Sequence, residues 1–309
     1  MGGIMAALRQ SAALRCRNKQ EGDMRLEGKV AIVAGAGWGG IGAAIAYRFA
    51  LEGARLVINS HRRIEKLEQT AEHIRAAGGE VTTVMGDVAE SATWAALVGT
   101  ARERFGQLDI FVHNAAHAVQ KRPADLSEAE WDRSMDVTLR GAWLGVRHCV
   151  PEMISAGGGA IVLISTVNAT ITNPLFGVYS VAKAGLNALT RSVALEYGRD
   201  GIRCNAIAPG QIVGERAAPA TSAELLEDQL SRDCYPLGRY GRPDEIASCA
   251  LFLASDEASF VTGAILTADG GLTLQSPEAL VRPSFRARWR DDVLVPQPPT
   301  DAGRPTTDD

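Results

Sequence analysis

The sequence of 309 residues lacks several features that would mark particular classes of protein. Its five cysteines, Cys16, Cys149, Cys204, Cys234 and Cys249, are odd in number and scattered, which disfavours a disulfide framework or a zinc site and favours reduced thiols. No apolar run approaches the ~20 residues that a membrane-spanning helix needs. The net charge of −4 gives no basic surface for nucleic acid. We therefore expect a cytoplasmic protein without a metal, a membrane or a nucleic-acid partner.

Residues 1–24 differ in composition from the rest of the chain. They carry four basic residues between Arg9 and Lys19 and no acidic residue before Glu21. This composition suits an organelle-targeting presequence, and it also suits an extension that stays disordered. We favour the disordered extension, with the folded part beginning near Met24, because nothing else in the sequence points to an organelle.

Residues 275–309 form a second stretch of different composition. The segment is rich in Pro and Arg and shows no sustained hydrophobic period. We expect a tail that is either solvated or ordered only by contact with a neighbouring surface. In the second case Phe285 and Trp289, which are four residues apart, are the expected anchors.

Between these ends, residues 25–274 alternate β-branched runs with helical stretches. Nearly continuous apolar strands separated by helices indicate a parallel sheet that is covered on both faces. We therefore predict a single doubly wound, Rossmann-type α/β domain with a mostly parallel sheet. Ligands of such sheets bind beyond the carboxyl ends of the strands. Strands are expected at 29–35, 54–60, 80–87, 108–116, 159–166, 201–210 and 263–271, and the first two helices at 41–53 and 63–79.

A glycine-rich turn, GAGWGGIG, comes directly after the first expected strand. Its glycines, among them Gly35, Gly37, Gly40 and Gly42, let the backbone turn tightly and approach a phosphate without a Cβ in the way. The next helix presents free N–H groups to a pyrophosphate. A merely flexible loop is the alternative, but the strand-turn-helix context favours a dinucleotide site.

The end of the second strand bears on the choice of cofactor. NAD-binding folds usually have an acidic residue there for the ribose hydroxyls, whereas this sequence has none before Glu65 and places Arg62 and Arg63 directly after the strand. A guanidinium binds a 2′-phosphate through paired hydrogen bonds, which favours NADP(H) over NAD(H). The alternative is that both arginines only decorate an exposed helix start.

Several short motifs together identify a family that the chain resembles. They are the glycine turn, GDV at 86–88, HNAA at 113–116, YSVAK at 179–183, APG at 208–210, RYGRPDEIA at 239–247 and TGAILTADGG at 262–271. In this order and spacing the chain resembles the short-chain dehydrogenases/reductases over roughly residues 25–274. The resemblance implies an NAD(P)(H)-dependent oxidoreductase that interconverts a secondary alcohol and a ketone by hydride transfer.

The family's proton-transfer pair corresponds here to Tyr179 and Lys183. Hydride transfer to a ketone leaves an alkoxide that must be protonated as it forms. A free tyrosine, with a pKa near ~10, exchanges protons poorly at neutral pH. A lysine one helical turn away favours the phenolate electrostatically, so we expect Lys183 to lower the pKa of Tyr179.

Two further catalytic positions depart from the family pattern. The serine that usually lies thirteen residues before the tyrosine corresponds to Thr166, whose hydroxyl can still orient a substrate oxygen. Its neighbour Ser165 should point to the other face of the strand. The asparagine of the preceding long helix, which in the family supports a bound water and a bend, corresponds to Thr138. Gly214 stands where a threonine is common, and the glycine turn is one residue longer than usual, near Trp38.

The resemblance also implies which residues contact the cofactor and how the chain associates. A homodimer or homotetramer is expected through the long helices at 135–156 and 178–199 and the last strand. The substrate is expected between residues 168–176 and 211–234, with His117 as a further candidate. The cofactor residues are Gly35, Gly37, Gly40, Ile41, Gly42, Arg62, Arg63, Asp87, Val88, Asn114, Ala115, Tyr179, Lys183, Pro209, Gly210 and Ile212.

A second hypothesis comes from a different functional class. The threonines at positions 138 and 166 suit an NADP(H)-binding regulator or partner protein with little turnover. Retention of Tyr179 and Lys183 argues against it, because a protein that only binds the cofactor gains little from a perturbed phenol.

Overall fold

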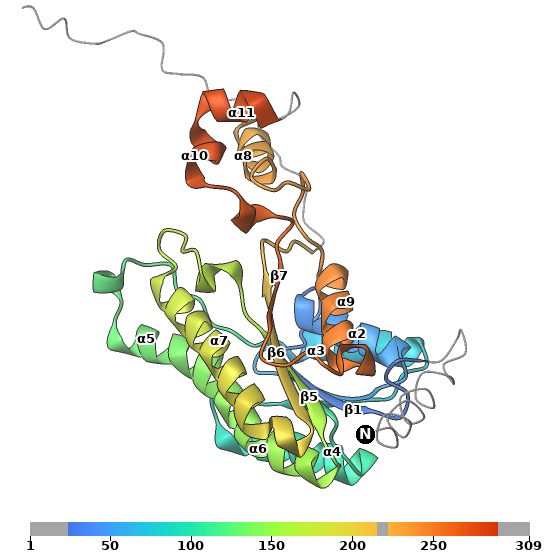
Figure 1. The fold of residues 1–309 in the computed structure, drawn as a ribbon. Helices are drawn as coiled ribbons and strands as arrows, with labels where there is room; N and C mark the ends of the chain where they lie inside the picture. The colour runs from blue at the N-terminus through green and yellow to red at the C-terminus, as the bar shows by residue number, and fades with distance from the viewer. Residues whose placement is uncertain (1–23, 215–221, 290–309) are drawn as a thin grey trace, which may run out of the picture.

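A seven-stranded, all-parallel sheet lies at the centre of the computed structural model, which describes residues 24–214 and 222–289 (Figure 1). The strand order is β3-β2-β1-β4-β5-β6-β7, so the chain winds outward from β1 in both directions. The predicted doubly wound α/β fold is confirmed, and each expected strand is present. The strands are β1 (Val30–Ala34), β2 (Arg55–Ser60), β3 (Val81–Met85), β4 (Ile110–His113), β5 (Gly159–Ile164), β6 (Ile202–Pro209) and β7 (Ile265–Ala268).

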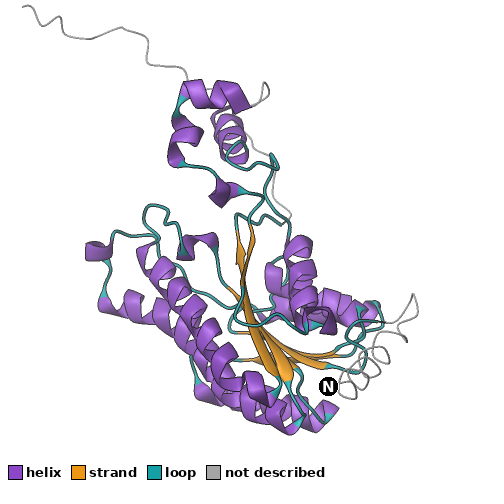
Figure 2. Cartoon of the chain, in the orientation of Figure 1, coloured by secondary structure: helices purple, strands orange, loops and turns teal. Residues whose placement is uncertain are grey.

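Helices cover both faces of this sheet, as Figure 2 shows by the strands between two helical layers. The first face packs against α2 (Ile41–Leu51), α3 (Ile64–Ala76) and α9 (Pro243–Ala254). The second packs against α4 (Ser91–Phe105), α6 (Gly141–Ser155) and α7 (Gly177–Tyr197). Successive strand residues point to opposite faces: Ile32 belongs to the second core and Val33 to the first. Burial on both faces explains why the strands are apolar at nearly every position.

The long helix expected at 135–156 is interrupted at its start. A capping box, in which Ser127 and Glu130 bond each other's backbone N–H groups, begins α5 (Glu128–Met135). A π-helical turn, η2 (Asp136–Arg140), then joins α5 to α6. Such turns are rare and concentrate at functional sites.

Three helices lie together beyond the carboxyl ends of β6 and β7 (Figure 1). They are α8 (Ser222–Arg232), α10 (Pro277–Val281) and α11 (Pro283–Trp289). Arg286 is only 2% exposed, and its guanidinium donates to the Asp233 carbonyl oxygen at 3.0 Å. Helical structure therefore continues past the boundary expected at residue 275, because a buried guanidinium holds α11 beside the end of α8.

Some of the expectations fall outside the described residues. These concern the extension at 1–23, the segment 215–221 of the expected substrate region, and the end of the tail at 290–309.

Candidate active site

Tyr179 and Lys183 lie on the first two turns of α7, where the spacing predicts them to share one face. The Lys183 Nζ lies 5.6 Å from the centre of the Tyr179 ring. Lys183 is 1% exposed, and its ammonium donates to the Ile164 carbonyl oxygen at the end of β5 at 2.5 Å. The lysine thus ties the start of α7 to the carboxyl end of a central strand, where ligands of this fold bind.

The Thr166 hydroxyl lies against the Tyr179 phenol. Thr166 comes after β5 in an extended conformation, and its hydroxyl also accepts from the backbone N–H of Asn168 at 3.3 Å. A hydrogen bond between Thr166 and the phenol favours the phenolate. The Ser165 hydroxyl is buried and has no hydrogen-bond partner among the described residues, so it takes no part in this contact. The structure thus brings together the three residues that counting along the motif selects.

Burial governs the pKa values of this pair. It raises the pKa of Tyr179, and the hydrogen bond from Thr166 opposes the rise only in part. Burial also lowers the pKa of Lys183 to about 7. Burial therefore sets the net direction of the Tyr179 pKa shift, and the stabilisation of the phenolate expected from Lys183 stays a prediction.

Thr138 lies within the π-helical turn and is fully buried. Its hydroxyl accepts from the backbone N–H of His117 at 3.1 Å. This bond links the turn to the segment after β4, and Thr138 thereby supports the helix irregularity at the position where the family has asparagine. It contacts the His117 backbone rather than Tyr179.

The glycine turn is closely packed on the segment after β4. Gly35 has φ of +83°, and a Cβ there would lie 2.7 Å from the Ala115 nitrogen. A Cβ on Gly42 would lie 2.2 Å from the Gly35 oxygen, which also accepts from the Asn114 amide at 2.7 Å. Neither position has room for a side chain, so the packing requires these two glycines.

A cavity of about 440 Å³ lies between the glycine turn, the end of β2 and the segment after β4. Seven of the expected cofactor residues line it, while Arg63 does not. Gly210 and Ile212 line a separate cavity of about 660 Å³ beside α9. The residues that line the first cavity are Gly35, Gly37, Asn59, Ser60, His61, Arg62, Asp87, Val88, Asn114, Ala115, Ala116, His117, Arg133 and Val137.

Positive charge dominates the mouth of the 440 Å³ cavity, at its β2 end. Asp87 is the one carboxylate among its lining residues, and the Arg133 guanidinium donates to it at 2.5 Å. Arg133 also lies 3.2 Å from Nδ1 of His61, and Arg62 completes the cationic rim. The hydrogen bonds to Arg133 and to the Ala89 backbone hold the pKa of Asp87 below its usual value, although burial opposes them.

Sequence reasoning missed several of these lining residues. His61 directly precedes Arg62 and could have been found from its place after β2. Arg133 lies 46 residues from Asp87, and nothing in its local sequence signals the contact. Asn59 was also missed, but its amide donates to the Val84 and Gly86 carbonyl oxygens at 2.9 and 3.0 Å and so braces β2 against β3.

The cavity has the properties of a dinucleotide site. Its volume suits part of a cofactor, and Gly35 and Gly37 of the glycine turn line it, with no room for a side chain at Gly35. Within residues 24–214 and 222–289, no group of three His, Cys, Asp or Glu side chains could hold a metal ion. The same residues include no helix that is long and apolar enough to cross a membrane. Their four cysteines form no disulfide.

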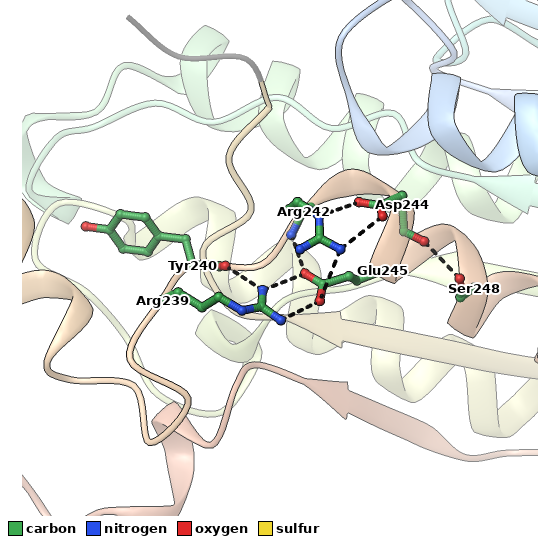
Figure 3. Close-up of polar contacts among 6 residues, drawn as sticks. All are labelled: Arg239, Tyr240, Arg242, Asp244, Glu245 and Ser248. Atoms are coloured by element: carbon green, nitrogen blue, oxygen red, sulfur yellow. Dashed lines mark hydrogen bonds and ion pairs between the residues drawn. The ribbon is translucent and has the colours of Figure 1, made fainter. Parts of the chain in front are cut away.

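The start of α9 holds the segment that comes after β6. The Arg239 guanidinium donates to both oxygens of Glu245 at 2.9 and 2.7 Å, and Glu245 accepts from the Arg242 backbone at 2.8 Å (Figure 3). These contacts lower the pKa of Glu245 to about 2. The network fixes Gly241, which pairs with Ile212.

The two departures near the glycine turn have a structural reason. A Cβ on Gly214 would lie 2.8 Å from the Gly39 carbonyl oxygen, so a threonine would collide with the lengthened turn. The extra length places Trp38 edge-on to His73 at 5.0 Å, and Tyr47 lies 4.3 Å from the same imidazole. The longer turn thus requires a glycine at position 214, because it leaves no room for a side chain there.

Comparison with known proteins agrees with this geometry. The family model described as Enoyl-(Acyl carrier protein) reductase matches residues 35–273. The chain belongs to the short-chain dehydrogenase/reductase family. Among its relatives, Glucose 1-dehydrogenase 2 of Bacillus subtilis is 39% identical over 251 residues, which is 81% of this chain and 96% of the relative. 3beta-hydroxysteroid dehydrogenase 1 of Eggerthella lenta is 38% identical and covers 81% of this chain and 95% of its own.

Solved structures support the same assignment. A crystal structure described as a short-chain dehydrogenase/reductase from Burkholderia xenovorans has a TM-score of 0.75 and 37% identity, and covers 82% of this chain and 99% of its own. A second crystal structure, described as a gluconate dehydrogenase from Agrobacterium tumefaciens, has a TM-score of 0.76 and 30% identity. It covers 82% of this chain and 99% of its own. The protein is therefore an oxidoreductase by family.

The expected substrate region of this short-chain dehydrogenase/reductase is partly described. Residues 171–175 are exposed, and Leu175 has φ of +69°. Asn168 is buried and accepts from the Asn173 amide at 3.3 Å, which ties this loop to the turn after Thr166. His117 faces the 440 Å³ cavity, where burial and the nearby Arg133 and Arg62 lower its pKa.

Proposed function

We propose that the protein interconverts a secondary alcohol and a ketone by hydride transfer with NADP(H), with Tyr179 as the general acid and base. The observation that carries the proposal is the Lys183 ammonium, which donates to the Ile164 carbonyl oxygen at the carboxyl end of β5 and lies 5.6 Å from the centre of the Tyr179 ring. A protein that only binds a cofactor gains little from a buried lysine held beside a half-buried phenol.

Each residue of the site has a distinct role. Thr166 donates to the substrate oxygen and orients it toward the phenol. In the reductive direction the Tyr179 hydroxyl gives its proton to the forming alkoxide, and in the oxidative direction the phenolate accepts it. The Lys183 ammonium stabilises the phenolate that remains. A bound nicotinamide supplies the hydride chemistry of the family.

Two features support NADP(H) as the preferred cofactor. The end of β2 has no carboxylate that would repel a 2′-phosphate, and Asp87 already pairs with Arg133. Arg62 and His61 line the same rim of the cavity. A guanidinium there gives a charge-assisted contact to a phosphate. Gly35, Gly37, Val88, Asn114 and Ala115 would hold the rest of the dinucleotide against the glycine turn.

The names of the relatives guide the choice of substrate. They include a glucose, a 3beta-hydroxysteroid and a cis-4-hydroxycyclohexanecarboxylate dehydrogenase, the last 41% identical over 246 residues. Each of these three substrates carries a hydroxyl group on a six-membered ring, whereas gluconate, named for one of the similar structures, is an open chain. We therefore propose a ring hydroxyl or ring ketone as the substrate class.

The first experiment measures turnover of NADPH and NADH with a panel of cyclic ketones, and of the oxidised cofactors with the matching alcohols. The expected result is turnover that is faster with NADPH and lost in Tyr179→Phe, while cofactor affinity is retained. Turnover with NADH alone would contradict the proposed preference for NADP(H), but it would still support an oxidoreductase. Tight cofactor binding without turnover in any reaction would favour the regulator or partner protein.

Self-association is proposed through the two surfaces expected from the sequence. Trp143 on α6 and Leu195 on α7 are 43% and 81% exposed, and Phe260 beside the edge strand β7 is fully exposed. Large exposed apolar side chains and an open sheet edge are typical of interfaces. A homodimer or homotetramer in the cytoplasm is the proposed state, and light scattering of the purified protein tests the association.

A further inference from the structure

Arg133 reaches the 440 Å³ cavity from α5, whereas the other charged residues that line it, Arg62 and Asp87, follow β2 and β3. Its guanidinium donates to the Asp87 carboxylate at 2.5 Å and lies 3.2 Å from Nδ1 of His61. Neither the hydride transfer nor the packing of the glycine turn uses these contacts. An arginine that holds two residues of the cavity rim therefore requires another role.

The first contact of Arg133 neutralises the carboxylate of the cavity. One Asp87 oxygen accepts from Arg133, and the other accepts from the backbone N–H of Ala89 at 3.0 Å. The side chains of Arg133 and Asp87 are 31% and 16% exposed, so water screens their charges less than those of a surface pair. With Arg62 included, the lining carries one positive charge in excess, and without Arg133 it would carry none. An unpaired carboxylate at this rim would repel a phosphate group.

The second contact fixes the tautomer of His61, whose side chain is 42% exposed and lines the same cavity. A guanidinium has N–H donors and no acceptor, so the His61 nitrogen that faces it, Nδ1, must carry the lone pair. The proton of the neutral ring is then on Nε2. The same Nδ1 lies 3.5 Å from the Asp87 carboxylate, which is farther than from Arg133. Arg133 thus holds His61 in the form whose Nε2–H can donate to an anion.

We propose that Arg133 is a positioning residue that sets the preference for the 2′-phosphate of NADP(H), because it neutralises Asp87 and holds His61 as an N–H donor beside Arg62. The inference rests on the choice of NADP(H) in the proposed function and needs nothing from the hydride chemistry. Arg133 acts through its two partners, so the preference requires no contact between its guanidinium and the phosphate.

Binding of two small ligands to the full chain tests this role without turnover. Adenosine 2′,5′-bisphosphate and AMP differ only in the 2′-phosphate, so the ratio of their Kd values, measured by calorimetry, reports the preference for that group alone. Arg133→Met should lower the preference by about tenfold or more, and Arg133→Met combined with Asp87→Asn should recover most of it. Arg140→Met is the control and should keep the wild-type ratio. It removes a guanidinium that donates to the Ala89 carbonyl oxygen at 2.6 Å and is absent from the cavity lining.

An unchanged ratio in Arg133→Met, or no recovery in the double variant, would overturn the inference. Equal affinities of the wild type for the two ligands would defeat the choice of NADP(H) and the inference together. A wild-type preference for the bisphosphate without turnover of any substrate would defeat only the proposed activity. If Arg133→Met does not fold, the ring nitrogen shifts of His61 in the wild type at pH 8 provide a second measurement. They should place the proton on Nε2, and a proton on Nδ1 would overturn the inference.

Discussion

The Lys183 ammonium lies 5.6 Å from the centre of the Tyr179 ring, and burial moves the pKa values of the two side chains in opposite directions. Each shift disfavours the charged form that the proton transfer uses. Groups that favour those charged forms are therefore decisive: Thr166 for the phenol and the Ile164 carbonyl oxygen for the lysine. The site thus depends on α7 and on the carboxyl end of β5.

Removing the Thr166 hydroxyl should impair catalysis more than removing its methyl group. Thr166→Val keeps the shape of the side chain but cannot donate to a substrate oxygen, so kcat should fall by roughly 10²-fold. Thr166→Ser keeps the hydroxyl and should stay within a few-fold of the wild type. Steady-state kinetics of both variants tests this, and an active Thr166→Val would exclude Thr166 from the chemistry.

The stability of the protein without cofactor should rise with pH through the titration of Lys183. Its folded pKa is about 7, whereas a lysine in the unfolded chain titrates near ~10.4. Between these values the unfolded chain binds the extra proton, so the free energy of unfolding increases with pH by at most about 1.4 kcal/mol per unit from this group. Urea unfolding of the wild type and Lys183→Met at pH 6.5, 8 and 9 measures the difference. Parallel curves would show that Lys183 titrates normally.

Adjacent arginines should differ in their effect on cofactor choice. Arg62 lines the 440 Å³ cavity and Arg63 does not. Arg62→Ala should raise the KM for NADPH by roughly tenfold or more and leave the KM for NADH nearly unchanged, since a charge-assisted hydrogen bond is lost. Arg63→Ala is the matched control and should change neither. Equal effects of the two substitutions would mean that both arginines act on cofactor binding only through the overall positive charge of this surface.

Two arginines of the C-terminal helices should also differ. Arg286 is buried against Asp233, while Arg282 pairs with Glu278 on the surface at 3.6 Å. Arg286→Met removes the buried guanidinium that contacts Asp233, and breaking a buried ion pair typically destabilises by about 3 kcal/mol, so α10 and α11 should lose protection from hydrogen exchange. Arg282→Met should leave the protection nearly unchanged. Retained protection in Arg286→Met would show that other contacts hold these helices.

The local sequence was sufficient to predict the fold and the pair Tyr179 and Lys183. Apolar runs of strand length alternate with helical stretches, and only a parallel sheet with helices on both faces buries them all. Tyr179 and Lys183 are one turn apart on a single helix, so their proximity results from helix geometry. Thr166 could be selected because it lies at a set distance from Tyr179 along the motif.

Contacts between segments that are far apart along the chain could not be predicted from local sequence patterns. Arg133 contacts Asp87, and Arg286 is buried against Asp233, only because strand order and helix packing bring these residues together. The direction of the Tyr179 pKa shift depends on the same packing, since it reflects how much water the surrounding chain removes. Hydrophobic periodicity and motif spacing predict only contacts between residues that are close together along the chain. Burial and charge at the site depend on which remote side chains the completed fold places there.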